Sequence, residues 1–415
     1  FFFQAEDGIR DVAVTGVQTC ALPICEAAVV GKPDEKWGEA PHAFIVLKDG
    51  ASATPENLRE FARERLAHFK TPHSFTFLPE LPKTATGKIQ KYVLLGGVAS
   101  AMLLYGLSLL YGVAGSTQYA DIAGALSMDT EAVRAPLLLA LTLIVCGLGF
   151  KVSAVPFHMW APDAYEGAPM PVTAYLSATS KGATLALFLR WFGGPLLPAI
   201  DQWQWMMAII ATLTMVFGNL IALQQHNIKR LLAYSSIAQG GFMLMAVTTV
   251  SDVSTSALLV HLGGYVVTNL ALFVAIIHFY NRTGKEEVTD FAGLSRTNPY
   301  LALVITAGLF SLAGMPLLAG FFTKFILFQA VVEGGFLWLV VVAVVGSTVS
   351  LFYYLQVIRQ MYIYEPEGDP TRWRLSATGY LATFVLLALI VFVGVYGGPL
   401  YTVADRAAYA LFAAG

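Results

Sequence analysis

From residue 92 to the C-terminus, the chain consists mainly of long apolar runs separated by short polar stretches. A helix needs about 20 consecutive apolar residues to cross the hydrocarbon core of a bilayer. Helices are favoured there because a lipid-exposed segment must satisfy its own backbone hydrogen bonds. The runs that reach this length predict spans at residues 93–113, 136–157, 172–191, 204–223, 230–250, 256–280, 299–331, 336–362 and 376–398.

Two of the predicted spans contain a helix break. Pro156 interrupts one of them, and Gly314 and Pro316 interrupt another. Such a break is tolerated at membrane depth where protein or a wet cavity satisfies the freed backbone groups. The breaks lie about 160 residues apart, which suggests two similar halves, as in many transporters. We therefore predict that residues 92–415 form a mainly α, polytopic transmembrane helix bundle with two broken helices.

A small α+β domain is predicted ahead of the bundle, in residues 26–91. The runs EAAVVG and PHAFIVLKDG predict strands, and the second run ends in an Asp-Gly turn. The run TPENLREFARERLAHF predicts a helix with Thr54 as its N-cap and Pro55 at its first position. Residues 1–25 show neither the helical nor the strand periodicity of hydrophobic positions. We expect them to be an artefactual or disordered leader, because FFFQAEDGIRDVAVTGVQTCALPI resembles a translated sequencing adapter.

The composition agrees with a membrane protein that carries a soluble segment. Hydrophobic residues make up 56% of the chain and charged residues only 13%, whereas soluble domains carry about 25% charged residues. Cys20, Cys25 and Cys146 form neither a CxxC motif nor a His/Cys cluster, so no metal site and no disulfide framework is indicated. The net charge of −2 points to no class of partner, and we expect no nucleic-acid binding.

Three lysines lie inside otherwise apolar spans: Lys151, Lys181 and Lys324. A lysine near the bilayer centre costs at least ~3 kcal/mol, so it persists mainly where it faces a bundle interior or a wet path. The alternative is that each side chain snorkels to the membrane surface. We expect instead that all three face inward along one polar axis at mid-membrane, where a buried amine can load and release a proton.

Three further polar residues are possible members of the same relay. His158 follows the first break, where a structural role and a relay role are equally supported. His261 and Tyr265 are spaced i, i+4 on one predicted helix and therefore share a face. That face either lines the wet path or packs as satisfied interhelical groups.

Residues 26–91 resemble the C-terminal domain of acyl-CoA synthetases and other adenylate-forming (AMP-binding) enzymes. The resemblance rests on EAAVVGKPDEKWGEAPHAFIVLKDG, LREFARERLAHFKTP and LPKTATGKIQK. In that family the lysine after the terminal glycine, here Lys88, reaches acyl and phosphate oxygens during adenylation, which suits a mobile ammonium. Nothing here resembles the large ATP-binding domain of that family. The resemblance therefore implies a vestigial adenylation lysine and, as one alternative function, an acyl-CoA ligase fragment without activity.

Residues 91–415 resemble the subunit N family of the bacterial proton-pumping NADH–quinone oxidoreductase, respiratory complex I. The motifs are KYVLLGGVASAMLLYGLSLLYG, GLGFKVSAVPFHMWAPDAYEGAPMPVTAYLSATSK, HNIKRLLAYSSIAQGGFMLM and SLAGMPLLAGFFTKF. The family has fourteen spanning helices, and this chain is similar to the last nine. The stretch KYVL belongs to both resemblances, which favours an artefactual fusion over a genuine two-domain protein.

This resemblance implies a proton-translocating, multi-pass subunit in the bacterial inner (plasma) membrane. It implies that Lys151 is the central lysine, Lys181 the relay and Lys324 the terminal group. Partners would be lipid and the other membrane subunits of complex I. The chain itself would bind no cofactor, and NADH and quinone would be used by the parent complex. A monovalent cation/proton antiporter subunit is the alternative, although the loop Tyr165-Glu166-Gly167 favours complex I.

Overall fold

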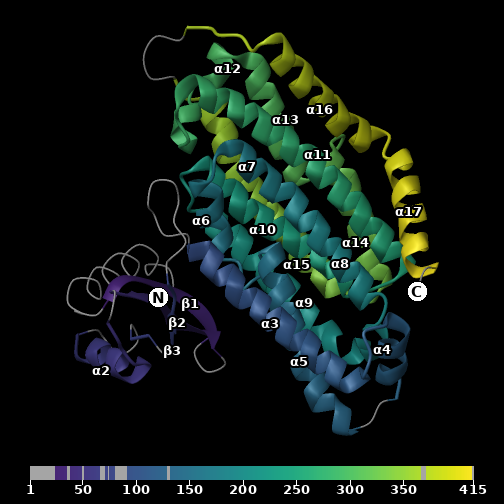
Figure 1. The fold of residues 1–415 in the computed structure, drawn as a ribbon. Coiled ribbons are helices and arrows are strands. Elements are labelled where there is room, and N and C mark those ends of the chain that lie inside the picture. The colour runs from purple at the N-terminus through teal and green to yellow at the C-terminus, as the bar shows by residue number, and fades with distance from the viewer. Residues whose placement is uncertain are drawn as a thin grey trace. The chain divides into compact units, whose positions relative to one another are not determined.

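The computed structural model describes residues 24–34, 38–48, 51–65, 71–72, 74–79, 91–128, 131–365 and 371–413. Internal contacts divide the chain into two compact units, Phe1–Ser100 and Ala101–Gly415 (Figure 1). The predictions for a leader at residues 1–25 and for an adenylation lysine at Lys88 fall on residues outside this description, except for the last two leader residues.

Among its described residues, the first unit contains a small sheet with strand order β1-β2-β3, one helix after β2, and the start of the helix Lys91–Ala114, which continues into the second unit. Strand β1 (Ile24–Asp34) pairs antiparallel with β2 (Gly38–Leu47), and β2 pairs parallel with β3 (Ser74–Phe77). Helix α2 (Pro55–Arg65) begins directly after Thr54, whose hydroxyl accepts the backbone N–H three residues later at 3.3 Å. The sequence therefore predicted this N-cap correctly.

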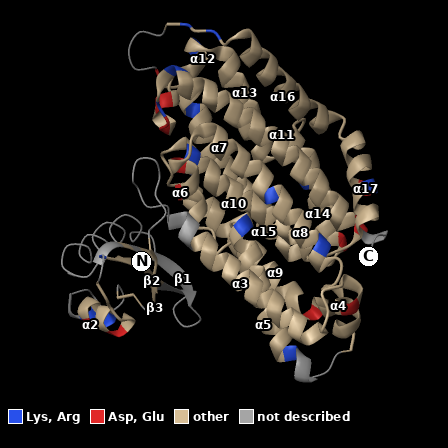
Figure 2. Ribbon diagram, in the orientation of Figure 1, with Lys and Arg blue, Asp and Glu red and all other residues tan. Residues whose placement is uncertain are grey.

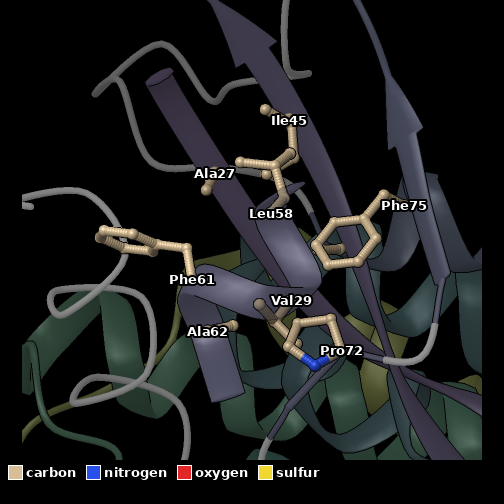
Figure 3. Close-up of a pocket in the computed structure, with 9 residues that line it drawn as sticks. Ala27, Val29, Ile45, Leu58, Phe61, Ala62, Pro72 and Phe75 are labelled. Atoms are coloured by element: carbon tan, nitrogen blue, oxygen red, sulfur yellow. The ribbon is translucent and has the colours of Figure 1, made fainter. Parts of the chain in front are cut away.

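Helix α2 packs its apolar side against the sheet. Ala27, Ala43, Ile45 and Leu58 are buried together and form the core of this unit. Figure 3 shows Leu58 directed from α2 toward Ile45 and Ala27, beside a small cavity. The residues that line the cavity are all apolar, so it is a gap in the core and offers no polar side chain to a ligand.

The second unit is a helix bundle (Figure 1). Some of its described helices are long and apolar enough to cross a membrane, judged by length and composition: Leu95–Ala114, Arg134–Val152, Leu197–Ala222, Asp252–Thr283, Leu337–Tyr362 and Ala377–Val395. The predicted fold class, a mainly α polytopic bundle, is therefore confirmed. In chain order the helices are α3 (Lys91–Ala114), α4 (Tyr119–Leu126), α5 (Glu131–Val152), α6 (Trp160–Gly167), α7 (Met170–Tyr175), α8 (Lys181–Phe192), α9 (Ile200–Ala222), α10 (Ile228–Val247), α11 (Asp252–Thr283), α12 (Leu294–Thr297), α13 (Pro299–Ala313), α14 (Ala319–Glu333), α15 (Leu337–Tyr362), α16 (Ala377–Val395) and α17 (Gly398–Ala413).

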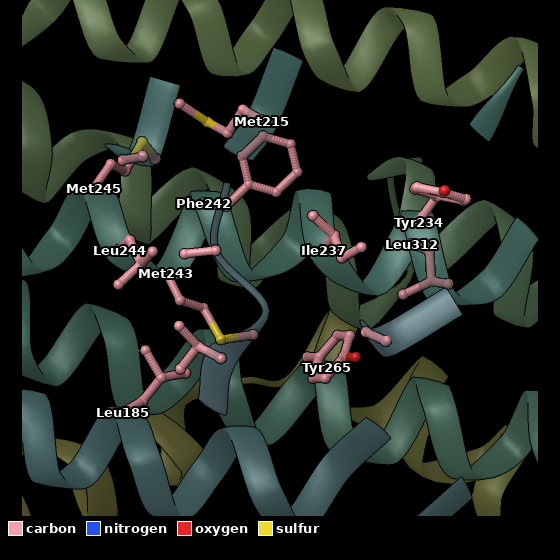
Figure 4. Packing of buried hydrophobic residues seen from close by; sticks show 14 of the residues in the cluster. Leu185, Met215, Tyr234, Ile237, Phe242, Met243, Leu244, Met245, Tyr265 and Leu312 are labelled. Atoms are coloured by element: carbon pink, nitrogen blue, oxygen red, sulfur yellow. The ribbon is translucent and has the colours of Figure 1, made fainter. Parts of the chain in front are cut away.

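Helix α10 lies at the centre of this unit. All its residues except Arg230 are buried, and Figure 4 shows the apolar part of its surroundings around Phe242 and Ile237. Helix α9 approaches it closely, because a Cβ at Gly241 would lie only 2.7 Å from the side chain of Met215. Small residues allow this kind of close backbone approach between membrane helices. The polar side chains on α10 are therefore enclosed by closely packed neighbouring helices.

The bundle contains both predicted helix breaks. Helix α5 ends at Val152, and α6 begins at Trp160, so the first break comes earlier than the predicted end of span 136–157. Helix α13 ends at Ala313, Gly314 adopts a left-handed φ of 93°, and α14 begins at Ala319. Glycine enters this conformation without steric cost, which explains its position at the end of a helix.

The structure adds a third irregularity that the sequence did not predict. Residues Leu176–Ser180 form one π-helical turn between α7 and α8. Lys181 follows this turn directly. Such turns are frequent at functional sites because they rotate the side chains that follow them.

Candidate functional site

Lys181 is buried between α8, α10 and the end of α5. Its side chain is 2% exposed. Its Nζ donates to the Oγ of Ser236 at 2.6 Å and also to the carbonyl oxygen of Ser236. A Cβ at Gly240 would lie 3.9 Å from this Nζ and 3.4 Å from the carbonyl oxygen of Val152. The ammonium group thus occupies a tight position whose hydrogen-bond partners are neutral.

A short chain of hydroxyl groups leads away from Lys181. The Oγ of Ser236 lies 2.6 Å from the hydroxyl of Tyr265, which donates to the carbonyl oxygen of Ser177 at 3.2 Å. Because the Tyr265 hydroxyl donates its one proton to the carbonyl oxygen of Ser177, it accepts the hydrogen bond from the Oγ of Ser236. The hydrogen bonds therefore run in one direction, from the lysine through a serine and a tyrosine to a backbone carbonyl.

Lys324 caps the broken end of α13. Its Nζ donates to the carbonyl oxygens of Leu312 at 2.7 Å and Ala313 at 3.3 Å, and to the Oγ of Ser347 at 3.2 Å. It also lies 4.8 Å from the ring centroid of Phe242. The last carbonyls of a helix lack intrahelical donors and carry the negative end of its dipole. The break therefore creates the acceptors that hold this ammonium group.

The face of α11 that carries His261 and Tyr265 is turned inward, because both residues are buried. The Nδ1 of His261 lies 3.0 Å from the Oγ1 of Thr323, the residue before Lys324. No hydrogen bond among the described residues joins His261 to Tyr265 or to Lys324. His261 thus lies beside the residue that precedes Lys324, without a direct hydrogen bond to either lysine.

His158 is buried after the first break, at 6% exposure. Within the described part of the chain, no hydrogen bond links its ring to Lys181 or Lys324. His158 thus forms no direct hydrogen bond with either buried lysine, and its relay role stays a prediction.

The expectation that all three lysines face inward is wrong for Lys151 in this structure. Lys151 is exposed, whereas its neighbour Val152 is buried. On α5, Lys151 follows the buried residues Ile144 and Leu148 by seven and three positions, so it shares their side of the helix. It is exposed in the last turn of α5, beyond the part of that side that neighbouring helices cover.

Charged side chains are otherwise gathered near the ends of the bundle, and isolated basic residues lie between them (Figure 2). Within the described residues, no acidic side chain forms an ion pair with Lys181 or Lys324. A buried charge usually needs such a partner to offset the loss of solvation. The absence of a carboxylate is what makes these two groups unusual.

An ion-pair cluster at one end joins α6 to the start of α10. Arg230 contacts Asp163 at 3.1 Å and Glu166 at 2.8 Å. Lys229 contacts Glu286 at 2.9 Å and donates to the carbonyl oxygen of Glu166 at 2.5 Å. These contacts fix the short helix that follows the first break, and they support a structural role for Asp163 and Glu166.

We expect Glu286→Gln to lower stability, because Lys229 is buried and would lose its carboxylate partner. The expected loss is about 1–3 kcal/mol, below the largest costs for broken buried pairs, since Glu286 is 21% exposed. The exposed pair Arg296–Glu365 provides the control, and Glu365→Gln is expected to change stability by less than ~1 kcal/mol. Thermal unfolding of both variants in detergent measures the difference. Equal shifts of the unfolding temperature in the two variants would contradict the assignment of Lys229–Glu286 as a stabilising buried ion pair.

Comparison with known proteins agrees with this architecture. A family model described as NADH:quinone oxidoreductase/Mrp antiporter, transmembrane, matches residues 83–350, and one described as AMP-binding enzyme C-terminal domain matches residues 21–88. The NADH-quinone oxidoreductase subunit N of Moorella thermoacetica is 42% identical over 322 residues, which are 78% of this chain and 67% of the relative.

Solved structures show the same fold. The Mrp complex from a Dietzia species matches with a TM-score of 0.70 and 25% identity, over 77% of this chain and 67% of that chain. Respiratory complex I from Thermus thermophilus matches with a TM-score of 0.62 and 33% identity, over 75% of this chain and 67% of that chain. The resemblance predicted for both segments is confirmed by the two family matches. From the bundle, its two breaks and these similarities, the chain belongs to the NADH:quinone oxidoreductase/Mrp antiporter family of membrane subunits.

Proposed function

We propose that the membrane part of this chain is the proton-translocating subunit of an NADH–quinone oxidoreductase in a bacterial inner membrane, with Lys181 and Lys324 as groups that load and release the proton. The observation that carries this proposal is the burial of both lysines among neutral partners. Burial disfavours the charged form of a lysine, and a nearby opposite charge restores it. Each amine can therefore exchange a proton when the charge of its surroundings changes.

The two lysines suit different steps. Lys181 connects to hydroxyl groups on α10 and α11, which accept and orient hydrogen bonds without carrying charge. Lys324 is held by backbone carbonyls at the second break. We assign Lys181 to the relay and Lys324 to the terminal exchange. Lys151 would enter the path from its exposed position on α5.

The same proposal extends to partners and to the redox reaction. The relatives are named as subunits of NADH-quinone oxidoreductase, so we infer that other membrane subunits of such a complex surround this chain. NADH oxidation and quinone reduction would take place elsewhere in the complex, and this chain would contribute the movement of protons.

Inner-membrane vesicles that contain the assembled complex test the proposal. Addition of NADH is expected to acidify the vesicle lumen, measured with a pH-sensitive dye, while quinone reduction is followed by absorbance. A proton uncoupler should abolish the acidification without slowing electron transfer. Quinone reduction that leaves the lumen pH unchanged would contradict the proposal.

A cation/proton antiporter subunit is the second candidate, favoured by the TM-score of 0.70 to the Mrp complex. The two functions differ in what drives transport. An antiporter exchanges sodium for protons across an imposed gradient without NADH, whereas the leading candidate requires NADH. Radioactive sodium flux in the same vesicles separates them.

The match of residues 21–88 to the AMP-binding enzyme C-terminal domain supports a third, weaker candidate. Its adenylation lysine, Lys88, lies outside the described residues. We expect the purified chain to form no acyl-CoA from ATP, a fatty acid and coenzyme A, because its match to that family covers only a C-terminal domain. Acyl-CoA detected by chromatography would reverse this expectation.

A further inference from the structure

A tryptophan side chain closes the first helix break, between α5 and α6. The last carbonyls of a helix have no donor within the helix and need one from elsewhere. Near the end of α5, the carbonyl oxygen of Phe150 accepts from the backbone N–H of Ser153 at 3.1 Å and from the Nε1 of Trp160 at 2.8 Å. Trp160 is the first residue of α6. Its indole therefore joins the two helix segments across the break.

Trp160 also packs on the ring of the residue to which it donates. The rings of Phe150 and Trp160 are stacked, with their centroids 5.2 Å apart and an angle of 27° between their planes. Stacked aromatic rings attract each other in addition to the effect of the apolar area that they bury. The indole thus holds Phe150 through both its side chain and its backbone.

The turn between the two helices has an unusual backbone conformation. Ser153 is buried and has a φ of 61°, in the left-handed region that residues other than glycine rarely adopt. Such a conformation persists only where the surrounding structure holds it. Before Ser153 in the chain, Trp160 holds the carbonyl of Phe150. After it, the backbone N–H of Val155 donates to the Oγ1 of Thr214 on α9 at 3.0 Å. The turn is therefore fixed on both sides of the strained residue.

The hydrogen bond from Trp160 acts directly on the backbone that carries Lys151. The carbonyl of Phe150 and the backbone nitrogen of Lys151 belong to one planar peptide group. A donor that fixes this carbonyl also fixes the orientation of the backbone at Lys151. The lysine is exposed in the last turn of α5, so its position depends mainly on that backbone.

Helix α6 gives the indole a firm base. The ion pairs of Arg230 with Asp163 and Glu166 attach α6 to the start of α10. Trp160 is the first residue of this short helix. The end of α5 is therefore connected through one side chain to a segment that is itself anchored to the central helix of the bundle.

We propose that Trp160 is a positioning residue for Lys151, whose indole N–H holds the end of α5 in place while protons are moved. This proposal rests on the proposed function, in which Lys151 enters the proton path. The donor at the second break is the ammonium group of Lys324, which exchanges a proton in that function. An indole N–H is a donor that keeps its proton. The first break therefore stays closed whatever the charge of the lysines.

Trp160→Phe tests the proposal in inner-membrane vesicles that contain the assembled complex. Phenylalanine keeps an aromatic ring beside Phe150 but offers no N–H to its carbonyl. A misplacement of about 1 Å can lower a rate by ~10²-fold. We expect the rate of lumen acidification, measured at an equal rate of NADH oxidation, to fall about tenfold. The amount of assembled complex on a native gel should equal that of the parent.

Trp203→Phe is the matched control. The Nε1 of Trp203 also donates to a backbone carbonyl at 2.8 Å, that of Leu196 in the connection between α8 and α9, and its ring contacts Phe192. Because Trp203 is fully buried, its variant should lower the unfolding temperature at least as much as Trp160→Phe. It should nevertheless leave the rate of acidification unchanged. An equal fall of this rate in both variants would overturn the positioning role.

Lys151→Met, alone and combined with Trp160→Phe, shows whether the tryptophan acts through the lysine. If it does, the double variant should acidify the lumen no more slowly than Lys151→Met alone. A further fall in the double variant, normal acidification by Lys151→Met, or loss of assembly in Trp160→Phe would overturn the proposal. A parent complex that moves no protons would instead overturn the proposed function, so the two failures are distinguishable.

Discussion

Lys181→Met is expected to stop proton translocation almost completely while the complex still assembles. Methionine fills a similar volume but cannot exchange a proton or donate to Ser236. The expected fall is about 10²-fold or more, the effect of removing a positioned proton-transfer group. The initial rate of lumen acidification after NADH addition measures it.

Lys181→Arg distinguishes proton exchange from charge alone. Arginine stays protonated at any accessible pH, so this variant keeps a cation on α8 but cannot release a proton. We expect it to be as inactive as Lys181→Met. Lys285→Met is the control, since Lys285 is half exposed and outside the bundle interior. Normal acidification by the arginine variant would show that only the charge of Lys181 matters.

Gly320→Ala is expected to prevent correct assembly of the second broken helix. A Cβ at this position would lie 1.7 Å from the carbonyl oxygen of Ser311, which is backbone and cannot move independently. Overpacking costs typically 1–3 kcal/mol and occasionally more, and we expect a value at or above ~3 kcal/mol here. The yield of folded protein after detergent extraction, measured by size-exclusion chromatography, reports the loss.

Gly112→Ala provides the matched control for this variant. No heavy atom lies within 4 Å of a Cβ built at Gly112, which is also helical. Alanine is favoured over glycine in a helix by about 1 kcal/mol, so the control should fold at least as well as the parent chain. Equal yields for the two variants would mean that α13 and α14 are not as tightly packed as described.

The sequence predicted both breaks and the described helices that are long enough to cross a membrane, because these depend on local properties. The predicted spans 172–191, 230–250 and 299–331 are not among those helices. Apolar runs long enough to span, and the residues Pro156, Gly314 and Pro316, are visible without knowledge of the fold. The burial of Lys181 and Lys324 followed from the same reasoning, since an isolated charge in an apolar run must face the interior.

The contacts of the site were not predictable to the same extent. Ser235 and Tyr354 come from separate helices, and the hydrogen bond between them depends on tertiary packing that no sequence periodicity indicates. A search for every polar residue in an apolar run would have found both, without indicating their partners. Lys151 shows the opposite error, because the same rule placed it inside although α5 leaves it exposed.

Because the Lys324 ammonium group caps the end of α13, it has two roles. Its nitrogen donates to the carbonyls of Leu312 and Ala313 at the end of α13, and on the proposed function it is also the group that releases the proton. Each discharge must then remove the counter-charge from a helix terminus. The hydrogen bonds that stabilise the end of α13 are therefore weakened and restored once in each transport cycle. Proton release from one nitrogen atom thus changes the stability of this helix end.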